Sequence, residues 1–590
     1  MSGEDRGSRG GEDRRIGRSF GTEFARSQLE AVSGKGLLAL QIRVGHRFHS
    51  VWWALPVLVV GSAIAIAVAK LVYPTPAGQA WLAAFPAVPP MPKLAPGMPG
   101  FMRWTHLFNF VLLAMIVRAG LQILVDHPRL YFNNACTPDS EWLRFRGPVP
   151  RDRRNSARPE EQWTSKDDSI PLTALVGLPG GRHTIGIARH WHFLADILFI
   201  VNGAVFLAIS FATGYWRWLV PTSWTIFPSA VSCLLSYTSL HHVSGPNAFF
   251  HLNALQQLAY FVVVYIMAPL AILTGLAQSP AFDNQHKWYQ RLFLNRQAAR
   301  SLHFLLMVGF VGFYAVHMLM VVIEPNFTLN LNHITLGINV DNFDGLAIFL
   351  FVLLLLVVLN VWLVWVSWNH TRVLQRLSNL TVGRLMDLLF DRAAPRAQFR
   401  EEDISPYFWP NGRVPTSDEW TRHRDSGYRD YRLRVTGLVE HPVELSLADL
   451  TEFDRQDQIT MHNCIQGWSG IGKWGGLPFR RLIEIVRPLP EAEWVMFYSF
   501  GEGGEGGTYY DSHSLHDLRH PQSLLAYEMN GGPLPEVHGA PLRLRVENQL
   551  GFKQVKWIKE IEFVRHFSER YAGHGGYNED HEFYGYRDEI

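Results

Sequence analysis

The motif Arg-x-x-His occurs three times at the start of a long apolar segment, in Arg103 with His106, Arg189 with His192, and Arg300 with His303. The third segment carries a second histidine, His317, fourteen residues after His303. At a helical rise of about 1.5 Å per residue, fourteen residues separate the two side chains by about 21 Å on nearly the same helix face. One histidine then lies toward each side of a bilayer, which is the spacing that two haems need.

The elements that must position these histidines are membrane helices. Of the 590 residues, 48% are hydrophobic and 18% are charged, and the apolar residues are concentrated in the first two thirds of the chain. A bilayer-spanning helix needs about 20 predominantly apolar residues. The stretch 224–240 is short and interrupted by Pro228, so we expect an interfacial or re-entrant segment there. The sequence predicts six transmembrane helices, at 51–73, 101–125, 192–214, 255–276, 301–323 and 345–368.

The composition changes after residue 370, where charged residues, glycine and proline return and apolar runs shrink to strand length. Three cysteines in 590 residues are too few for a disulfide framework. The N-terminal residues are rich in Gly, Ser, Arg and Glu, which is typical of disorder. We therefore predict a disordered basic tail at 1–45, a transmembrane domain at 46–370, a linker at 371–424, a soluble domain at 425–570 and a tail at 571–590.

Lysine and arginine favour the cytoplasmic ends of membrane helices. With six spans, the basic N-terminus, the basic loops 126–189 and 277–300, and the C-terminal domain share one side. This predicts a multi-pass protein of the bacterial inner (plasma) membrane with the soluble domain in the cytoplasm. A miscount of one span would place that domain on the opposite side of the membrane. We expect the lipid bilayer as a partner, expect no nucleic acid partner, and leave a homo-oligomer open.

Alternating helix directions predict which histidines face one another. His192 and His303 lie near the cytoplasmic side, whereas His106 and His317 lie near the opposite side. A histidine in hydrocarbon is costly without a partner, and two imidazoles can bind one haem iron from opposite faces. We therefore predict a haem between His192 and His303 and another between His106 and His317. Three arginines, each one turn closer to the membrane edge, are expected to contact haem propionates: Arg103, Arg189 and Arg300.

Two other histidines compete for these roles. His190 precedes His192 by two residues, but aligning the segment with that around His303 favours His192. His46 also follows an arginine at the same spacing, yet no histidine at haem depth is left to pair with it. A single intramembrane histidine can equally form a helix-packing hydrogen bond, so the hypothesis depends on the matched set of four.

The segment 100–325 resembles the dihaem b-type cytochrome subunits of membrane hydrogenases, formate dehydrogenases and thiosulfate reductases. The resemblance implies two b haems and electron exchange with a quinone or quinol. This chain adds a helix before and after the four-helix bundle of that family. The runs that carry the resemblance are Arg103-Trp104-Thr105-His106, Arg189-His190-Trp191-His192-Phe193, Asn253-Ala254-Leu255-Gln256, Leu273-Thr274-Gly275-Leu276 and the pair His303 and His317.

The soluble domain carries a cysteine in the run His462-Asn463-Cys464-Ile465-Gln466-Gly467-Trp468-Ser469. By itself, Cys464 is more typical of a buried free thiol. Together with the runs Leu525 to Gly531, His538 to Leu544 and Gly551 to Ile558, however, it resembles the sulfite oxidase type of molybdopterin domain, an α+β fold. The resemblance implies that the Cys464 thiolate binds molybdenum and that Asn463, His538, Lys553 and Lys556 contact the pterin and its phosphate.

The chain departs from sulfite-oxidising members, which have an arginine-rich stretch where Gln466, Gly467 and Trp468 follow the cysteine. Sulfite is therefore not the expected substrate. Joining the two halves predicts a membrane-bound, molybdenum-dependent oxidoreductase that exchanges electrons between the quinone pool and a small oxo-transfer substrate, with S-oxide or N-oxide reduction favoured. The alternatives are a non-catalytic redox relay or sensor with the same fold, and a proton transporter that uses its membrane histidines without haem.

Overall fold

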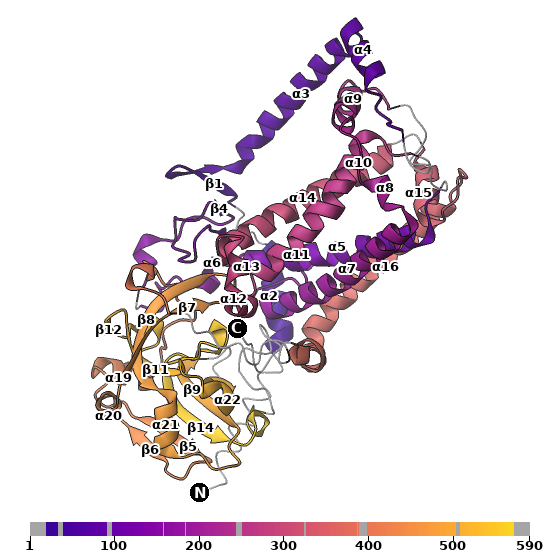
Figure 1. Ribbon diagram of the computed structural model, residues 1–590. Coiled ribbons are helices and arrows are strands. Elements are labelled where there is room, and N and C mark those ends of the chain that lie inside the picture. Colours follow the sequence, from indigo (N-terminus) through magenta and orange to yellow (C-terminus); the bar gives the residue numbers. More distant parts are fainter. Residues whose placement is uncertain are drawn as a thin grey trace.

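The computed structural model describes residues 19–32, 39–90, 97–156, 158–182, 184–243, 251–323, 326–385, 388, 398–502 and 508–571. These residues form two parts that lie end to end (Figure 1). We call residues 19–385 the helical domain and residues 398–571 the sheet domain. Parts of the predicted tails at 1–45 and 571–590, namely residues 1–18, 33–38 and 572–590, lie outside the described residues.

The predicted count of membrane helices is confirmed. Six helical segments among the described residues are long and apolar enough to cross a bilayer. The stretch predicted as interfacial or re-entrant contains helix α9, Ile226–Thr238, whose 13 residues are too few for a span. The six segments are η1 with α3 (Val51–Val72), α5 (Gly100–Asp126), α7 (Ile185–Thr213), α10 through α11 (Ala254–Ala277), α14 (Arg296–Ile323) and α16 (Asp344–Asn369).

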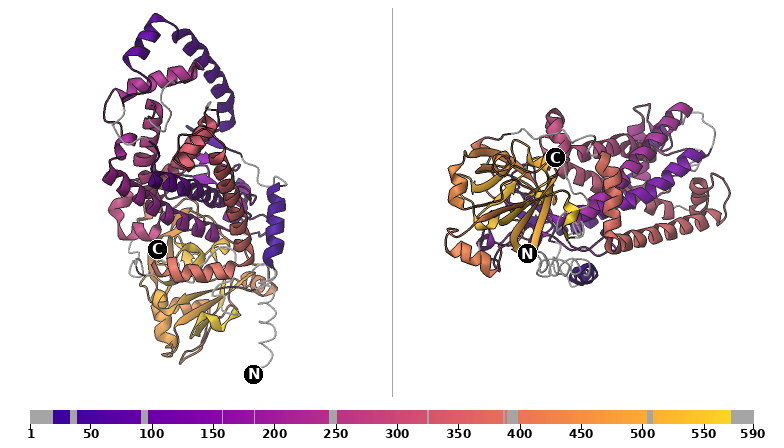
Figure 2. Two further views of the ribbon diagram at one scale, coloured as in Figure 1. Left: turned by 90° about the vertical axis from the view of Figure 1, so that its right-hand side faces the viewer. Right: turned by 90° about the horizontal axis from the view of Figure 1, so that it is seen from below.

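Five of these segments gather into a bundle, in which α5 lies along α7 and α11 lies along α14. The first span, α3, runs apart from the bundle and meets it through α9 at the far end (Figures 1 and 2). The fourth span contains a π-helical turn, η3, at Val262–Met267 between α10 (Ala254–Phe261) and α11 (Ala268–Ala277). The bundle is therefore the part of the helical domain that can enclose the four histidines.

Two helices begin earlier than predicted. Helix α7 begins at Ile185 and α14 at Arg296, so Arg189 and Arg300 lie inside their helices rather than before them. The first turns of α14 are buried because the connection between α5 and α7 folds over them; Ser301, for example, donates a hydrogen bond to the Tyr131 carbonyl (2.6 Å). Protein rather than lipid or water surrounds this end of the bundle.

The N-terminal segment expected to be disordered contains regular structure where it is described. Helix α2 spans Ser19–Val32, and strands β1 (Gln41–Val44) and β2 (Arg47–Ser50) form a hairpin. Strand β1 also pairs with β4 (Leu143–Arg144) from the α5 to α7 connection. Pairing with a distant strand supplies hydrogen bonds that the local composition could not reveal.

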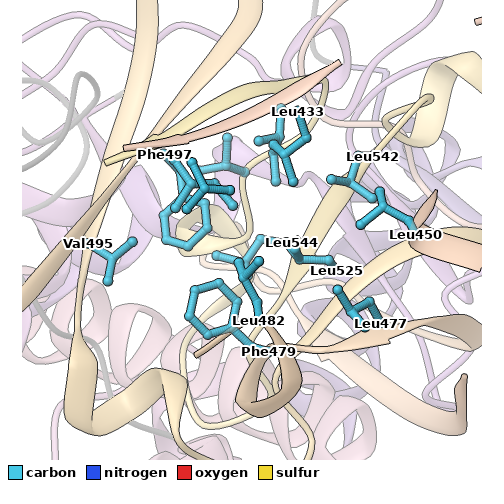
Figure 3. Packing of buried hydrophobic residues seen from close by; sticks show 14 of the residues in the cluster. Leu433, Leu450, Leu477, Phe479, Leu482, Val495, Phe497, Leu525, Leu542 and Leu544 are labelled. Atoms are coloured by element: carbon cyan, nitrogen blue, oxygen red, sulfur yellow. The ribbon is translucent and has the colours of Figure 1, made fainter. Parts of the chain in front are cut away.

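The sheet domain has the mixed α and β architecture that was predicted for the C-terminal region. One sheet has the order β10-β9-β14-β5-β6, and the other has the order β12-β11-β8-β7 with β13 paired to β11. Side chains of both sheets, such as Leu433, Phe497 and Leu544, form a continuous apolar core together with Phe479 of helix α21 (Phe479–Val486) (Figure 3). The strand bounds are β5 (Leu433–Gly437), β6 (Val443–Leu445), β7 (Gln456–Asn463), β8 (Ser469–Pro478), β9 (Trp494–Glu502), β10 (Thr508–Ser514), β11 (Leu524–Met529), β12 (Gly532–Pro533), β13 (Arg543–Arg545) and β14 (Ile558–Val564).

Part of the expected linker at 371–424 is packed into the sheet domain. The Phe399 N–H donates to the Ile459 carbonyl (3.0 Å) and the Ser405 N–H to the Ile471 carbonyl (3.0 Å). Trp420, on helix α19 (Asp418–Asp425), is fully buried in the core. Large aromatic side chains give this region apolar surface to bury, so it is structural rather than a simple spacer.

Candidate functional site

The structure brings the four predicted histidines together in the two predicted pairs. The ring centroids of His106 and His317 are 6.2 Å apart, and those of His192 and His303 are 6.3 Å apart. A metal–nitrogen distance of about 2 Å on each side, plus about 1 Å from each nitrogen to its ring centre, gives roughly 6 Å. Both pairs therefore have the separation of two imidazoles that bind one iron from opposite faces.

Hydrogen bonds orient the second pair. His192 Nδ1 lies 3.1 Å from the Ile116 carbonyl, which can only accept, so Nδ1 carries the proton. His303 Nδ1 lies 3.0 Å from Thr274 Oγ1, whose own proton goes to the Leu270 carbonyl (2.8 Å). In both rings Nε2 is then left with its lone pair, the tautomer that a metal needs.

Glycines and one acid complete the surroundings of this pair. A Cβ at Gly120 would lie 3.2 Å from His192 Cε1, and one at Gly275 would lie 3.7 Å from His303 Cε1, so both helices approach the rings closely. Asp196, which the sequence analysis did not single out, lies one turn after His192, with Oδ2 3.6 Å from His192 Nε2. An acidic residue four positions after His192 in an apolar helix could have identified Asp196 from the sequence, because an ionisable residue in a membrane segment indicates a functional role.

The three arginines predicted to contact propionates have different surroundings. Arg103 donates to the Thr335 carbonyl (3.0 Å), and the guanidinium of Arg189 lies 5.6 Å from the Phe193 ring centre. Arg300 donates to the carbonyls of His127 and Arg129, both at 2.8 Å. A propionate would compete with the hydrogen bonds of Arg103 and Arg300, so a role for Arg189 requires the least rearrangement.

The competing histidine His190 does not face the predicted partner of His192. Its Nδ1 lies 3.2 Å from Ser378 Oγ, on the helix α17 (Thr371–Ser378) that follows the last span. His190 therefore serves packing between helix ends in this structure.

Cys464 lies in the hairpin turn that joins β7 to β8, which we call the cysteine loop (residues 464–468). The turn is closed by hydrogen bonds from the Cys464 N–H to the Trp468 carbonyl and from the Gly467 N–H to the Cys464 carbonyl, both at 3.0 Å. Gly467 has φ +99°, which favours glycine. The Cys464 side chain is buried in an aromatic core that also includes Phe408 and Trp474.

Two predicted cofactor contacts, Asn463 and His538, adjoin this core together with His462, which was not among the predicted contacts. His462 Nδ1 accepts a hydrogen bond from Arg545 (2.9 Å), and burial followed by the charge of Arg545 holds the His462 pKa well below its usual value. Burial followed by the charge of Lys556 likewise lowers the pKa of His538. Both imidazoles are therefore neutral. The Asn463 side-chain oxygen is buried and has no hydrogen-bond partner among the described residues.

Buried positive charge surrounds this site. Arg543 NH1 donates to the His538 carbonyl (2.8 Å) and Lys556 Nζ to the Val537 carbonyl (3.0 Å), so both cations rest on neutral groups. Burial is the main cause that lowers the pKa of each group. The charge of Arg545 further lowers the pKa of Arg543, and the charge of Arg543 further lowers the pKa of Lys556. Arg543 Nε is buried without a hydrogen-bond partner among the described residues. An anionic cofactor would supply the missing negative charge and acceptors.

Lys553 differs from Lys556, although both were predicted to contact the cofactor. Its buried ammonium forms an ion pair with the buried Asp511. The carbonyl of Lys553 also accepts from His513 Nε2 (2.7 Å). The Lys553 charge is therefore already compensated by the protein, whereas that of Lys556 is not.

The sequence analysis missed two residues of the charged site. Arg543 and Arg545 alternate with Leu544 on β13, so both side chains lie on one face of the strand. Two arginines on one face of a short apolar strand could have predicted a buried site for an anion from the sequence. Phe408, which packs against the rings of His462, Trp468, Trp474 and His538, lies in the expected linker and carried no such signal.

No three His, Cys, Asp or Glu side chains among the described residues are grouped closely enough to hold a metal by themselves. A metal bound by one cysteine, or by one pair of histidines, therefore requires further ligands from an organic group. A porphyrin fits the histidine pairs in this respect, and a pterin dithiolene fits the single cysteine.

Comparison with known families decides the nature of the two parts. Residues 97–337 match the family described as prokaryotic cytochrome b561, and residues 419–572 match the family described as oxidoreductase molybdopterin binding domain. The chain combines a cytochrome b561-type domain with a molybdopterin-binding oxidoreductase domain. The predicted family resemblance is confirmed, and the six apolar helices with the cytochrome match identify an integral membrane protein.

Individual relatives cover smaller regions. The "Putative protein-methionine-sulfoxide reductase subunit YedZ1" of Azospira oryzae is 33% identical over 161 residues, which are 27% of this chain and 58% of the relative. The "Protein-methionine-sulfoxide reductase catalytic subunit MsrP" of Campylobacter jejuni is 30% identical over 148 residues, 23% of this chain and 50% of the relative. The chain thus spans about half the length of these curated relatives.

Among solved structures, the sulfane dehydrogenase SoxCD from Paracoccus pantotrophus is 26% identical, with a TM-score of 0.21, and the match covers 23% of this chain and 39% of that chain.

Proposed function

We propose that this protein is a membrane-bound molybdenum enzyme that oxidises a quinol and reduces a small S-oxide. His106 with His317 and His192 with His303 would each hold one b haem, Cys464 would hold the molybdenum, and the haems would supply single-electron transfer between the quinol and the molybdenum. The observation that carries the proposal is the two facing imidazole pairs, 6.2 and 6.3 Å between centroids, in the same chain as the molybdopterin-binding domain.

The overall reaction balances without another reactant. Oxidation of a quinol to a quinone releases two electrons and two protons, and reduction of R₂SO to R₂S and water consumes two of each. The preference for an S-oxide rests on the relatives, whose names describe methionine-sulfoxide reductases. Molybdenum, when bound, supplies oxygen-atom transfer coupled to a two-electron change.

The residues of the chain have distinct roles in this proposal. Cys464 supplies a thiolate ligand, while Arg543 and Lys556 hold the anionic part of the pterin cofactor and are themselves compensated by it. Asn463 and His538, the latter neutral, supply polar groups to the same cofactor. Phe408, Trp468 and Trp474 limit the access of water to the cysteine, because they belong to the same buried cluster as Cys464.

The arrangement of the loops supports placing the molybdopterin-binding domain in the cytoplasm. The N-terminal hairpin, the α5 to α7 connection and the start of α14 all lie at the end of the bundle that adjoins that domain (Figure 1). These are the arginine-rich connections of the chain, and arginine-rich connections favour the cytoplasmic side.

Reduced-minus-oxidised visible spectra of the purified protein, with iron and molybdenum analysis, test the proposal. We expect two haems and one molybdenum per chain, and haem oxidation when a small S-oxide is added. Cys464→Ser should keep both haems and lose turnover. Purified protein that contains haem but no molybdenum, or one that is not oxidised by any S-oxide, would contradict the proposal.

A further inference from the structure

The cysteine loop lies directly against the first turns of α14, the helix that carries His303 and His317. Gln297 Nε2 donates to the Gly467 carbonyl (2.9 Å) and to Ser469 Oγ (3.1 Å), and Arg296 NH1 donates to the same Gly467 carbonyl (3.2 Å). Gln297 is fully buried. Helix α14 of the cytochrome domain and the cysteine loop are therefore joined by direct hydrogen bonds, without an intervening segment of the chain.

The backbone at Gly467 approaches the helix closely. A Cβ built at this glycine would lie 3.2 Å from Arg300 Cζ and 3.2 Å from Arg300 Nε. Arg300 cannot easily move away, because its guanidinium is fixed by the carbonyls of His127 and Arg129. Glycine is therefore required here for contact with the helix as well as for its positive φ.

The end of α5 and the connection after it contact the cysteine loop and the adjoining residue Ser469, the first of β8, from other sides. Gln466 Nε2 donates to the carbonyl of Asp126, the last residue of α5 (3.3 Å). Ser469 Oγ donates to the Asn134 carbonyl (2.8 Å), and the Ser469 N–H donates to Cys136 Sγ (3.4 Å). Contacts on several sides of a short turn limit its movement relative to the helix end.

The contact also adjoins one predicted haem site. Arg300 precedes His303 by one helical turn, a rise of about 4.5 Å. His303 faces His192, and Gly467 is hydrogen-bonded within the loop to Cys464. We propose that electrons pass between the haem of His192 and His303 and the metal at Cys464 through this contact of α14 with Gly467, and that Gln297 is the positioning residue that maintains it.

This inference rests on the proposed function and adds a route to it. Each transfer oxidises one ferrous haem iron to ferric and reduces the molybdenum by one electron, so two transfers supply the two electrons that the S-oxide consumes. His317 lies farther along α14 than His303, so a haem held by His106 and His317 would supply its electrons by way of the haem of His192 and His303.

The test uses Gln297→Ala in the full-length holoprotein, with Ser301→Ala as the matched control. Ser301 lies one turn further along the same buried helix face, but its hydrogen bonds go to Tyr131 and Trp142 of the helical domain. In stopped-flow experiments, the haems are first reduced anaerobically and then mixed with dimethyl sulfoxide or methionine sulfoxide. In parallel, a reduced viologen dye supplies electrons directly to the molybdenum.

Gln297→Ala removes two hydrogen bonds, which lowers the equilibrium constant for the contact by roughly tenfold or more. We expect haem oxidation to slow by about tenfold, with haem spectra, haem potentials, molybdenum content and dye-driven turnover unchanged. Ser301→Ala should leave haem oxidation at the wild-type rate. If Gln297→Ala loses molybdenum, Gln297→Glu replaces it, because a glutamate has the shape of glutamine but cannot donate when it is ionised.

Haem oxidation at the wild-type rate in a molybdenum-containing Gln297 variant would overturn the inference and leave the proposed function intact. Loss of molybdenum from both Gln297 variants would assign the residue to cofactor retention and would also overturn it. Failure of the wild-type protein to oxidise its haems with S-oxide is a separate result, which would contradict the proposed function itself.

Discussion

Arg543 and Arg545 lie on the same face of strand β13, yet we predict opposite effects when each is replaced by methionine. Arg545 forms a two-bond ion pair with the buried Glu547, at 2.9 and 2.8 Å. Arg543 donates to a backbone carbonyl, and its Nε is buried without a hydrogen-bond partner among the described residues. Both arginines are less than a tenth exposed.

The magnitudes follow from what each substitution leaves behind. Arg545→Met leaves the Glu547 carboxylate buried and unpaired, which costs about 3–5 kcal/mol of unfolding free energy. Arg543→Met removes a buried cation and an unsatisfied donor while losing one hydrogen bond to the His538 carbonyl, so the cofactor-free protein should be about 1–3 kcal/mol more stable. Retention of an anionic cofactor should fall by roughly 10- to 150-fold, the value of one charge-assisted hydrogen bond.

Denaturant unfolding of protein produced without molybdenum cofactor, followed by tryptophan fluorescence in detergent, measures the first two quantities. Molybdenum and pterin content after dialysis of the loaded protein measures the third. Arg434→Met serves as the control, because this exposed strand residue pairs with the mostly buried carboxylate of Glu560 far from the cysteine loop. Equal destabilisation by Arg543→Met and Arg545→Met, or unchanged cofactor retention in Arg543→Met, would refute the charge argument.

Three further predictions concern haem binding, the pH dependence of stability, and the buried ion pairs of Arg129 in the connection between α5 and α7. His303→Leu and His317→Leu should each remove one haem and keep the other, so that haem per chain falls by about half in each; retention of both haems would contradict the pairing. Burial, followed by the charge of Lys553, lowers the pKa of His513 to about 3. The unfolded chain then binds one proton more than the folded chain below about pH 6.5, and stability falls by about 1.4 kcal/mol per pH unit as pH decreases toward 3; His513→Gln should make denaturant unfolding correspondingly less dependent on pH. Arg129→Met leaves Asp168 and Glu141 buried without their shared cation and should cost about 3–5 kcal/mol in thermal or denaturant unfolding; a loss below 1 kcal/mol would show that water reaches these carboxylates.

Some segments have regular or buried structure that the sequence did not predict, because their contacts are with residues distant in sequence. Strand β1 has few local signals and is stabilised by pairing with β4, about a hundred residues later. Phe408 belongs to a region without regular apolar periodicity, and only the closed core around Cys464 explains why it is buried. Local composition predicts disorder or a linker in such cases, because the stabilising contacts are not local.

The sequence by itself predicted the six spans and the depths of the four histidines from local rules, namely helical rise, bilayer thickness and the cost of a histidine in hydrocarbon. Cys464 became a candidate metal ligand only through the resemblance of its surrounding runs to a known family. Only the tertiary structure separated Lys553, which Asp511 neutralises, from Lys556, which rests on a carbonyl. Only the tertiary structure placed Gln297 against Gly467, because contacts between residues 170 positions apart depend on how the two domains pack.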